Sequence, residues 1–376
     1  MGSVTVTKPS LPPLDEYVEL LREIWDSRWL TNKGQFHDRL EAELAEVLGV
    51  PHVALFCNGT IALQVGLQAL KITGEVITTP YSFVATTHAI YWNHCTPVFC
   101  DVDPVTGNLD PAKVESLITP RTTAIMPVHV YGTPCDLAAL QRVADTYGLR
   151  LLYDAAHAFG VTAGGRTVLD AGDVTMLSFH GTKVFTTAEG GALVTADAKL
   201  KKRIDFLKNF GFADEVTVVA PGTNGKMSEL SAALGLVQLR HFDAEVEKRA
   251  RVDALYRRRL AGVAGLRLLP IAPGVRSNYS YFPVFVDESA YPVSRDTLYD
   301  ELKAAGYYGR RYFYPLISEF PSYRGLPSAD HVPVAQRLSR EVLCLPIYAG
   351  LPEADVEAIC DIVARAPRAA AVRAGA

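Results

Sequence analysis

Residues 174–183 read Val-Thr-Met-Leu-Ser-Phe-His-Gly-Thr-Lys, and this stretch decides the fold that we expect. Its first part, Val174–Phe179, is short and largely apolar, as is typical of a strand buried inside a parallel sheet. Its second part is small and polar and ends in Lys183. A lysine that follows a buried strand can lose its water, so its pKa falls and its amine can form a Schiff base. The alternative is an ordinary surface lysine.

Similar short apolar runs lie on both sides of this stretch. The pattern predicts further strands at Glu75–Thr79, Pro97–Val102, Thr123–Val128, Leu149–Tyr153 and Gly191–Thr195. Helical stretches such as Pro111–Leu117 and Asp136–Tyr147 lie between several of them. This alternation favours an α/β fold in which crossover helices flank the sheet.

The pattern changes after residue 200. The sequence predicts helices at Lys199–Asn209 and Met227–Phe242, and Asp243–Leu260 continues as a long charged helix. A strand at Ser280–Val286 and helices at Arg295–Ala305 and Pro352–Ala364 then indicate a smaller α+β region. We therefore expect an N-terminal arm and helix, a large α/β domain, and a part made of the long helix and a small C-terminal α+β domain, over residues 1–35, 36–242 and 243–376.

A second motif, Cys57-Asn58-Gly59-Thr60, is suited to binding an anion. Asn58 is a good N-cap, Gly59 allows the backbone to approach closely, and Thr60 adds a hydroxyl. A helix that begins here would point free N–H groups and its positive end at a negatively charged ligand. The alternative is a plain capped helix.

Two more motifs follow predicted strands. Phe83, in Thr79-Pro80-Tyr81-Ser82-Phe83, could stack on a flat ring or belong to the core. Asp154 ends a buried strand, which is costly for a carboxylate unless a cation or a donor meets it. A protonated pyridine nitrogen is such a partner, although Asp154 could instead cap a helix. His157 could bond the same ring or a backbone group, and Ser178 and Thr182 offer hydroxyls for a phosphate.

Together these four features predict a pyridoxal 5′-phosphate (PLP) site. The anion-binding helix start suits the phosphate, Phe83 suits the ring face, Asp154 suits the ring nitrogen and Lys183 suits the aldehyde. Each feature has an ordinary structural explanation on its own. A chance assembly of all four in this order is much less plausible than any one of those explanations.

The sequence resembles the DegT/DnrJ/EryC1/StrS family of sugar-nucleotide aminotransferases over nearly its whole length. The resemblance implies a fold-type-I PLP-dependent transferase similar to aspartate aminotransferase, with a large, mixed, mostly parallel sheet flanked by helices. The matching segments are Trp29-Leu30-Thr31 with Gly34, Asn58–Thr60, Pro127–Gly132, Asp154–His157, Ser178–Lys183, Glu189–Gly191, and Asn224 with Met227–Glu229.

The resemblance also implies roles for individual residues. Lys183 would carry the cofactor, Asp154 would pair with its ring nitrogen and Phe83 would stack on the ring. Further cofactor-binding positions are His157 near the ring oxygen, His180 in the lysine motif, and, at the phosphate, Gly59, Thr60 and Ser178. Asn224 matches an asparagine that reaches the neighbouring subunit's cofactor, which implies a homodimer with shared active sites. No metal is implied.

The stretch Lys183–Thr187, together with Arg310–Leu316, is more similar to C4 than to C3 aminotransferases. This similarity implies transfer of an amino group from L-glutamate to C4 of dTDP-4-keto-6-deoxy-D-glucose or a related sugar nucleotide. Arg310 and Arg311 could bind a diphosphate or the donor carboxylate, or they could be a solvated pair. Glu189 and Tyr312 are further candidates for substrate contact.

Three other functions stay open at this point. The chain could be a C3 sugar-nucleotide or cyclitol aminotransferase of the same family. It could be a regulator that binds PLP without catalysis. It could be a dehydratase, although the dehydratases of this family carry a histidine in place of the lysine, so Lys183 favours transamination.

Composition excludes several other classes. Lys and Arg number 37 against 41 Asp and Glu, for a net charge of −4, so no dense basic surface is available for nucleic acid. No run of about 18 apolar residues predicts a membrane span. The six cysteines are scattered without a C-x-x-C pair, and the N-terminus has no leader-like apolar region. We therefore expect a cytoplasmic enzyme with reduced thiols and no membrane or nucleic-acid partner.

Overall fold

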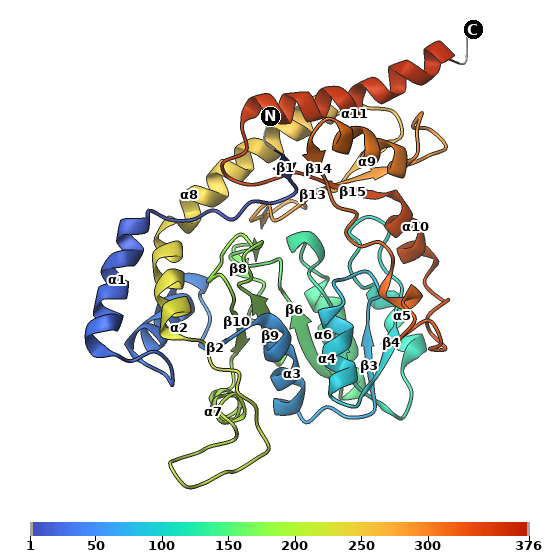
Figure 1. The fold of residues 1–376 in the computed structure, drawn as a ribbon. Coiled ribbons are helices and arrows are strands. Elements are labelled where there is room, and N and C mark those ends of the chain that lie inside the picture. Colours follow the sequence, from blue (N-terminus) through green and yellow to red (C-terminus); the bar gives the residue numbers. More distant parts are fainter. Residues whose placement is uncertain (1–2, 374–376) are drawn as a thin grey trace.

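The computed structural model describes residues 3–373, with a seven-stranded sheet at its centre (Figure 1). Along the sheet the strands lie in the order β2-β10-β9-β6-β5-β3-β4. β10 runs antiparallel to both of its neighbours, and the other pairs are parallel. The expected mixed, mostly parallel sheet is confirmed. Its strands are β2 (His52–Phe56), β3 (Glu75–Thr78), β4 (Thr96–Phe99), β5 (Thr122–Met126), β6 (Arg150–Asp154), β9 (Val174–Ser178) and β10 (Gly191–Thr195).

Helices cover both faces of this sheet because successive strand residues point to opposite sides. Leu152 and Met176 pack on the face covered by α3 (Gly59–Ala69), α4 (Ala85–Trp92) and α7 (Ala198–Leu207). Their neighbours Leu151 and Leu177 pack on the opposite face. That face is covered by α5 (Pro111–Val114), α6 (Leu137–Tyr147), α2 (Gln35–Leu48) and the first half of α8.

Helix α8 (Glu229–Leu260) is one continuous helix of 32 residues. Ser228 caps its start by accepting a hydrogen bond from the N–H of Ser231 at 3.2 Å. Its first half packs with α1 (Leu14–Ser27) and α2, and its second half packs in a separate core of the C-terminal part. The boundary expected between residues 242 and 243 therefore falls inside this helix, which Figure 1 shows running from the central sheet to the C-terminal part.

The C-terminal part is built on a three-stranded antiparallel sheet in the order β11-β13-β15. Its elements are β11 (Leu266–Leu268), β13 (Phe282–Val286), β15 (Val342–Leu345), α9 (Arg295–Ala304), α10 (Pro333–Glu341) and α11 (Glu353–Arg373). The N-terminal arm joins this part, because β1 (Val4–Thr5) pairs in parallel with β14 (Tyr307–Tyr308). A small sheet of β7 (Thr162–Ala163), β8 (Arg166–Thr167) and β12 (Val275–Arg276) links the two parts.

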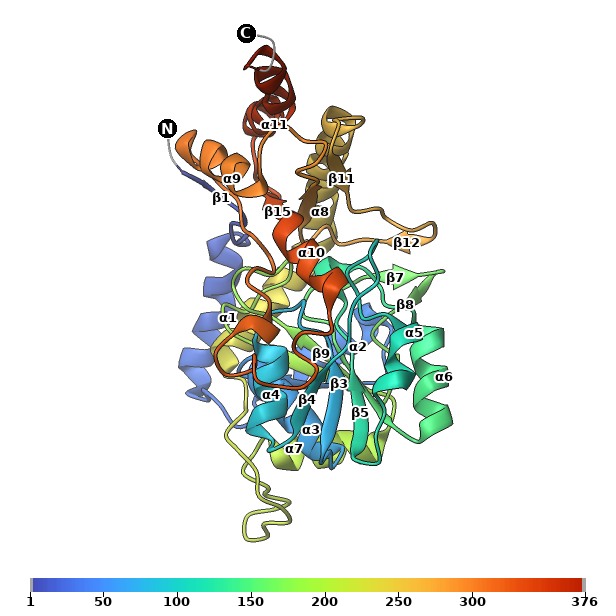
Figure 2. The same ribbon diagram turned by 90° about the vertical axis from the view of Figure 1, so that its right-hand side faces the viewer.

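The expected functional residues follow the carboxyl ends of parallel strands. Asp154 ends β6, Ser178 ends β9, and Phe83 lies in the loop after β3. These strand ends face the C-terminal part, as the two views of the molecule show (Figures 1 and 2). Ligands of open α/β sheets bind at this edge. Within the described residues, no helix is long and apolar enough to span a membrane.

Candidate active site

A cavity of about 350 Å³ lies at this edge, between the central sheet and the C-terminal part. It brings together eleven of the residues singled out from the sequence, which are Gly59, Thr60, Phe83, Asp154, His157, Ser178, His180, Lys183, Glu189, Arg310 and Tyr312. Residues from both parts of the chain therefore form its wall.

Asp154 lies at the inner end of the cavity and is 4% exposed. Its Oδ2 accepts a hydrogen bond from Thr86 Oγ1 at 2.8 Å, and its Oδ1 accepts from the N–H of Ala156 at 3.0 Å. Burial raises the pKa of Asp154 above its ordinary value, and these two donors and Lys183 offset only part of that rise. A buried carboxylate oriented in this way suits a cationic ring nitrogen.

Lys183 projects into the same cavity from the turn after β9. Its N–H donates to the carbonyl of His180 at 2.9 Å, which shapes that turn. Burial lowers the pKa of the Lys183 amine to about 8, although the nearby Asp154 carboxylate raises it. About a tenth of this amine is therefore uncharged at pH 7, far more than for a free lysine, and the uncharged form is the one that a nucleophile or a base requires.

The start of α3 presents free backbone donors to the cavity, as an anion-binding cradle requires. Asn58 caps the helix by accepting from the N–H of Ile61 at 2.9 Å, so the first N–H groups of the helix need another partner. A Cβ atom on Gly59 would lie 3.1 Å from the Cβ of Ser178 and 3.2 Å from the sulfur of Met176, which leaves little room for any other residue. Thr60 and Ser178 add hydroxyls to the cavity wall. This donor set fits a phosphate.

His157 is buried between aromatic rings. Its ring stacks parallel to Phe313 at 6.0 Å and meets the edge of Tyr281 at 4.9 Å. The N–H of Tyr131 donates to its Nδ1 at 3.2 Å, so that nitrogen is an acceptor. Burial, together with Lys183, holds the pKa of His157 well below its usual range. The ring is therefore neutral and carries its proton on Nε2.

Phe83, His180 and Glu189 lie at the mouth of the cavity, where Phe83 is 59% exposed. The Nε2 atom of His180 lies 3.7 Å from Glu189, and its Nδ1 accepts from the N–H of Thr182 at 3.2 Å. These side chains are accessible to a ligand that enters from solvent.

The two arginines have different surroundings. Arg310 lines the cavity, and its guanidinium lies 6.0 Å from the ring of Tyr312. Arg311 is not part of the cavity wall and instead pairs with Asp296 at 2.8 Å. Asn224 also lies outside this cavity, where its Oδ1 accepts from Lys226 Nζ at 2.8 Å.

Several further residues of the site were not predicted from the sequence. Tyr281 and Phe313 line the cavity from the C-terminal part, and Thr86 holds Asp154 from α4. Tyr131 and Tyr81 join their hydroxyls at 2.6 Å, and Tyr131 donates to the carbonyl of Tyr312. Tyr81, Tyr131 and Phe313 lie within segments singled out from the sequence, and Thr86 lies one helical turn after the Ser82-Phe83 motif, but no role was assigned to any of them.

The fold and the site together define a PLP-dependent aminotransferase. The phosphate cradle, the buried carboxylate and the amine with a lowered pKa are the three groups that this cofactor requires. The chain belongs to the DegT/DnrJ/EryC1/StrS aminotransferase family, whose profile matches residues 14–364.

Individual relatives support this assignment over nearly the full length. A dTDP-4-amino-4,6-dideoxy-D-glucose transaminase of Escherichia coli is 53% identical, with 93% of this chain and 95% of that protein covered. A transaminase of the same name from Shigella dysenteriae is 48% identical, with 96% and 98% covered. The crystal structure of DesI in the presence of its TDP-sugar product is 40% identical and superposes with a TM-score of 0.95, covering 100% of this chain and 95% of that one.

Proposed function

We propose that this chain transfers an amino group from L-glutamate to C4 of a nucleotide-linked 4-keto-6-deoxyhexose, dTDP-4-keto-6-deoxy-D-glucose, in the cytoplasm. The observation that carries the proposal is the cavity in which Lys183 and Asp154 meet beside the Gly59–Thr60 cradle. The two transaminases that are 53% and 48% identical support the choice of C4 and of the sugar.

The residues of this chain would hold PLP at its phosphate, ring nitrogen and aldehyde. Gly59, Thr60 and Ser178 would bind the phosphate, and Asp154 would face the ring nitrogen. Lys183 would bind the aldehyde. When bound, PLP supplies an electron sink for the charge that develops when a C–H bond next to nitrogen is broken.

Lys183 is positioned to move the proton in this chemistry. Part of its amine is uncharged near neutral pH and, in that form, can take the proton from Cα of the amino donor. In the second half of the reaction the same Nζ would return a proton to C4 of the sugar. Asp154 would keep the ring nitrogen protonated, and the Nε2–H of His157 would donate to the ring oxygen. The aromatic groups Phe83, Tyr281 and Phe313 would exclude water.

The sugar nucleotide would enter past His180, Glu189 and Tyr312. Arg310 lines the cavity and is the arginine suited to a diphosphate or a donor carboxylate. Arg311 is engaged by Asp296, so it would support the neighbouring loop. These substrate contacts are part of the proposal.

A second copy of this chain would complete the site. Asn224 lies outside its own cavity, next to a projecting segment that carries several exposed apolar side chains, which are Phe210, Phe212, Val216, Val218 and Val219. Apolar side chains gathered on one projection favour a protein partner. A homodimer would bring Asn224 to the cofactor phosphate of the partner.

Reduction with borohydride tests the proposal directly. Purified protein should be yellow, and borohydride should fix the cofactor to the peptide that contains Lys183, while Lys183→Ala should lose turnover. Incubation with glutamate and a panel of keto-sugar nucleotides should then give an amine at C4, assigned by NMR. An amine at C3 would favour the C3 or cyclitol activity, and a product without an amine would favour a dehydratase. No conversion of the bound cofactor by glutamate would favour a regulator.

A further inference from the structure

Asp154 accepts a hydrogen bond from one hydroxyl group, which is itself bonded to a second, and the proposed mechanism uses neither. Thr86 Oγ1 lies 2.8 Å from Asp154 Oδ2, and Ser82 Oγ lies 2.8 Å from that same Thr86 hydroxyl. Thr86 is fully buried, whereas Ser82 lines the cavity. The three side chains thus form a continuous chain of hydrogen bonds from the cavity wall to the carboxylate.

The charge of Asp154 decides the direction of these hydrogen bonds. An ionised carboxylate can only accept, so Thr86 donates to Asp154 and Ser82 in turn donates to Thr86. The other oxygen of Asp154 accepts from the N–H of Ala156. Thr86 also lies in the first turn of α4, where the positive end of the helix favours an anion. The carboxylate is therefore oriented through both of its oxygens.

We propose that Thr86 is a positioning residue for the reaction, which, with Ser82, holds the Asp154 carboxylate ionised and directed at the ring nitrogen of the cofactor. This inference rests on the role proposed for Asp154. It adds the hydroxyl of Thr86, on α4, to that role. Without this hydroxyl the Asp154 carboxyl group would stay protonated to higher pH.

The surroundings of Asp154 support this assignment. Burial raises the pKa of Asp154, and the hydrogen bond from Thr86 lowers it more than the Ala156 N–H or Lys183 does. Two ionisable groups from other elements interact electrostatically with Asp154. They are Lys183, after β9, and Cys135, in the loop before α6. Neither of them bonds to the carboxylate in the described residues, so Thr86 is the side chain that orients it.

A matched pair of valine variants tests the proposal. Thr86→Val removes the hydroxyl and keeps the shape of the side chain. Thr87→Val makes the same change at the next position of α4, where the side chain is equally buried and its Oγ1 has no hydrogen-bond partner among the described residues. Thr86→Ser keeps the hydroxyl and should restore the wild-type behaviour.

The first measurement needs no bound cofactor. The infrared carboxyl band that is lost in Asp154→Asn reports protonation of Asp154 in the full-length apoprotein. Its midpoint should lie about one to two pH units higher in T86V than in the wild type, because a hydrogen bond to a charged group is lost. T87V and T86S should match the wild type. Ser82→Ala should shift the midpoint in the same direction by less, which keeps a test available if T86V does not fold.

The second measurement uses the holoenzyme. In T86V the pH titration of the cofactor's visible absorption should shift, and kcat should fall about tenfold with little change in KM for the sugar nucleotide. Equal midpoints in T86V, T87V and the wild type would overturn the inference whatever the activity. An inactive wild type in which T86V still shifts the midpoint of Asp154 would count against the proposed function and not against the role of Thr86.

Discussion

At the scale of single residues, the pKa values of Lys183 and Asp154 are set by two opposed effects, which are burial and the attraction between the two charges. Burial favours the uncharged form of each group, so it lowers the pKa of the lysine and raises that of the acid. Their mutual attraction acts in the opposite sense on both. The lysine is therefore held near the point at which it can both accept and release a proton close to neutral pH.

The first prediction concerns the titration of Lys183. Acylation of Lys183 in the apoprotein should rise with pH through about 8, since only the uncharged amine reacts. Asp154→Asn removes the anion that raises this pKa, so the midpoint should fall by about one pH unit. Peptide mass spectrometry measures the labelling, with the exposed Lys71 in the same digest as a reference. A midpoint that is unchanged or higher in D154N would show that the two groups do not interact.

Lys183 and Asp154 could be predicted because each follows an expected strand within a short recognisable motif, and Gly59 because it lies in a motif typical of a capped helix start. The place of Tyr281 and Phe313 in the cavity could not be predicted, because both come from the C-terminal part, and only its packing brings them to the cavity. For Asn224 and Arg311, no pattern in the neighbouring sequence shows whether the side chain lines the cavity or lies outside it. The roles of the individual residues stay predictions.

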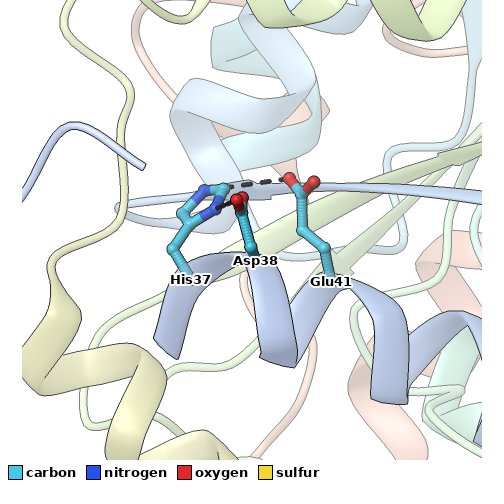
Figure 3. A group of neighbouring side chains, drawn as sticks. All are labelled: His37, Asp38 and Glu41. Atoms are coloured by element: carbon cyan, nitrogen blue, oxygen red, sulfur yellow. Dashed lines mark ion pairs between the residues drawn. The ribbon is translucent and has the colours of Figure 1, made fainter. Parts of the chain in front are cut away.

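At the scale of elements, a buried polar cluster joins α2, β2 and α7. Figure 3 shows His37, Asp38 and Glu41 on α2, with Nδ1 of His37 at 3.5 Å from Asp38 and its Nε2 at 3.7 Å from Glu41. Glu41 also accepts from the N–H of Leu55 at 3.0 Å and from Lys201 and Lys208 at 3.2 and 3.0 Å. Two lysine ammonium groups thus already balance this carboxylate. The arrangement suits a structural ion-pair network better than a metal site.

The second prediction follows from His37, which is 1% exposed. Burial lowers the pKa of His37 to about 4, from 6.5 for a free histidine, so the unfolded chain takes up a proton that the folded chain refuses. The contribution of the neutral His37 to the free energy of unfolding is complete above pH 6.5 and is lost as the pH drops toward 4. Below that, Glu41, whose pKa is lowered to about 2 from 4.5 by its cationic partners in spite of burial, adds a loss of its own.

Thermal and urea unfolding at pH 7 and pH 5 provide the measurement. The wild type should lose about 1–2 kcal/mol more than His37→Gln over this interval, because the variant has no group that titrates there. Asp38→Asn, at the exposed neighbour of His37, serves as the control and should keep most of the wild-type slope. Parallel curves for wild type and H37Q would mean that His37 titrates in the folded protein as it does in the unfolded chain.

The strands show where local patterns suffice and where they do not. Every strand expected in the central sheet is present, because buried parallel strands have an apolar composition that is visible in a short window. Strand β2 was not predicted, since its five residues are placed by pairing with β10, which comes more than 130 residues later. Helix α8 has the expected extent except at its start, which Ser228 moves to Glu229.

At the scale of the whole molecule, several of the exposed apolar side chains gather in three places. They lie at the end of α1 and just after it, at the end of α4, and on the segment after α7 that projects from the body in Figure 1. In the same order, the side chains are Trp25, Trp29 and Leu30; Tyr91 and Trp92; and Phe210, Phe212, Val216, Val218 and Val219. We expect a second copy of the chain to cover them.

The third prediction tests that dimer. Val216 and Val218 are 86% and 56% exposed, so changing both to Asp should not disturb the fold of one chain. The double variant should dissociate at concentrations at which the wild type sediments as a dimer, because charges placed in an apolar interface are not compensated. Val105→Asp, at an exposed valine outside these three places, is the control. A monomeric wild type, or a double variant as dimeric as V105D, would contradict the expectation.

The reversed direction of β10 has a consequence for the cradle of α3. β10 begins where the antiparallel β2 ends, with Gly191 opposite Phe56. The first residue of β10 therefore lies against the first turn of α3. A Cβ atom at Gly191 would lie 2.7 Å from the nitrogen of Gly59. Even a single methyl group there would displace the first amide groups of α3, which we propose bind the phosphate. The proposed phosphate site therefore depends on two glycines that are 132 positions apart in the chain, because a side chain on either one would take up the space that the site needs.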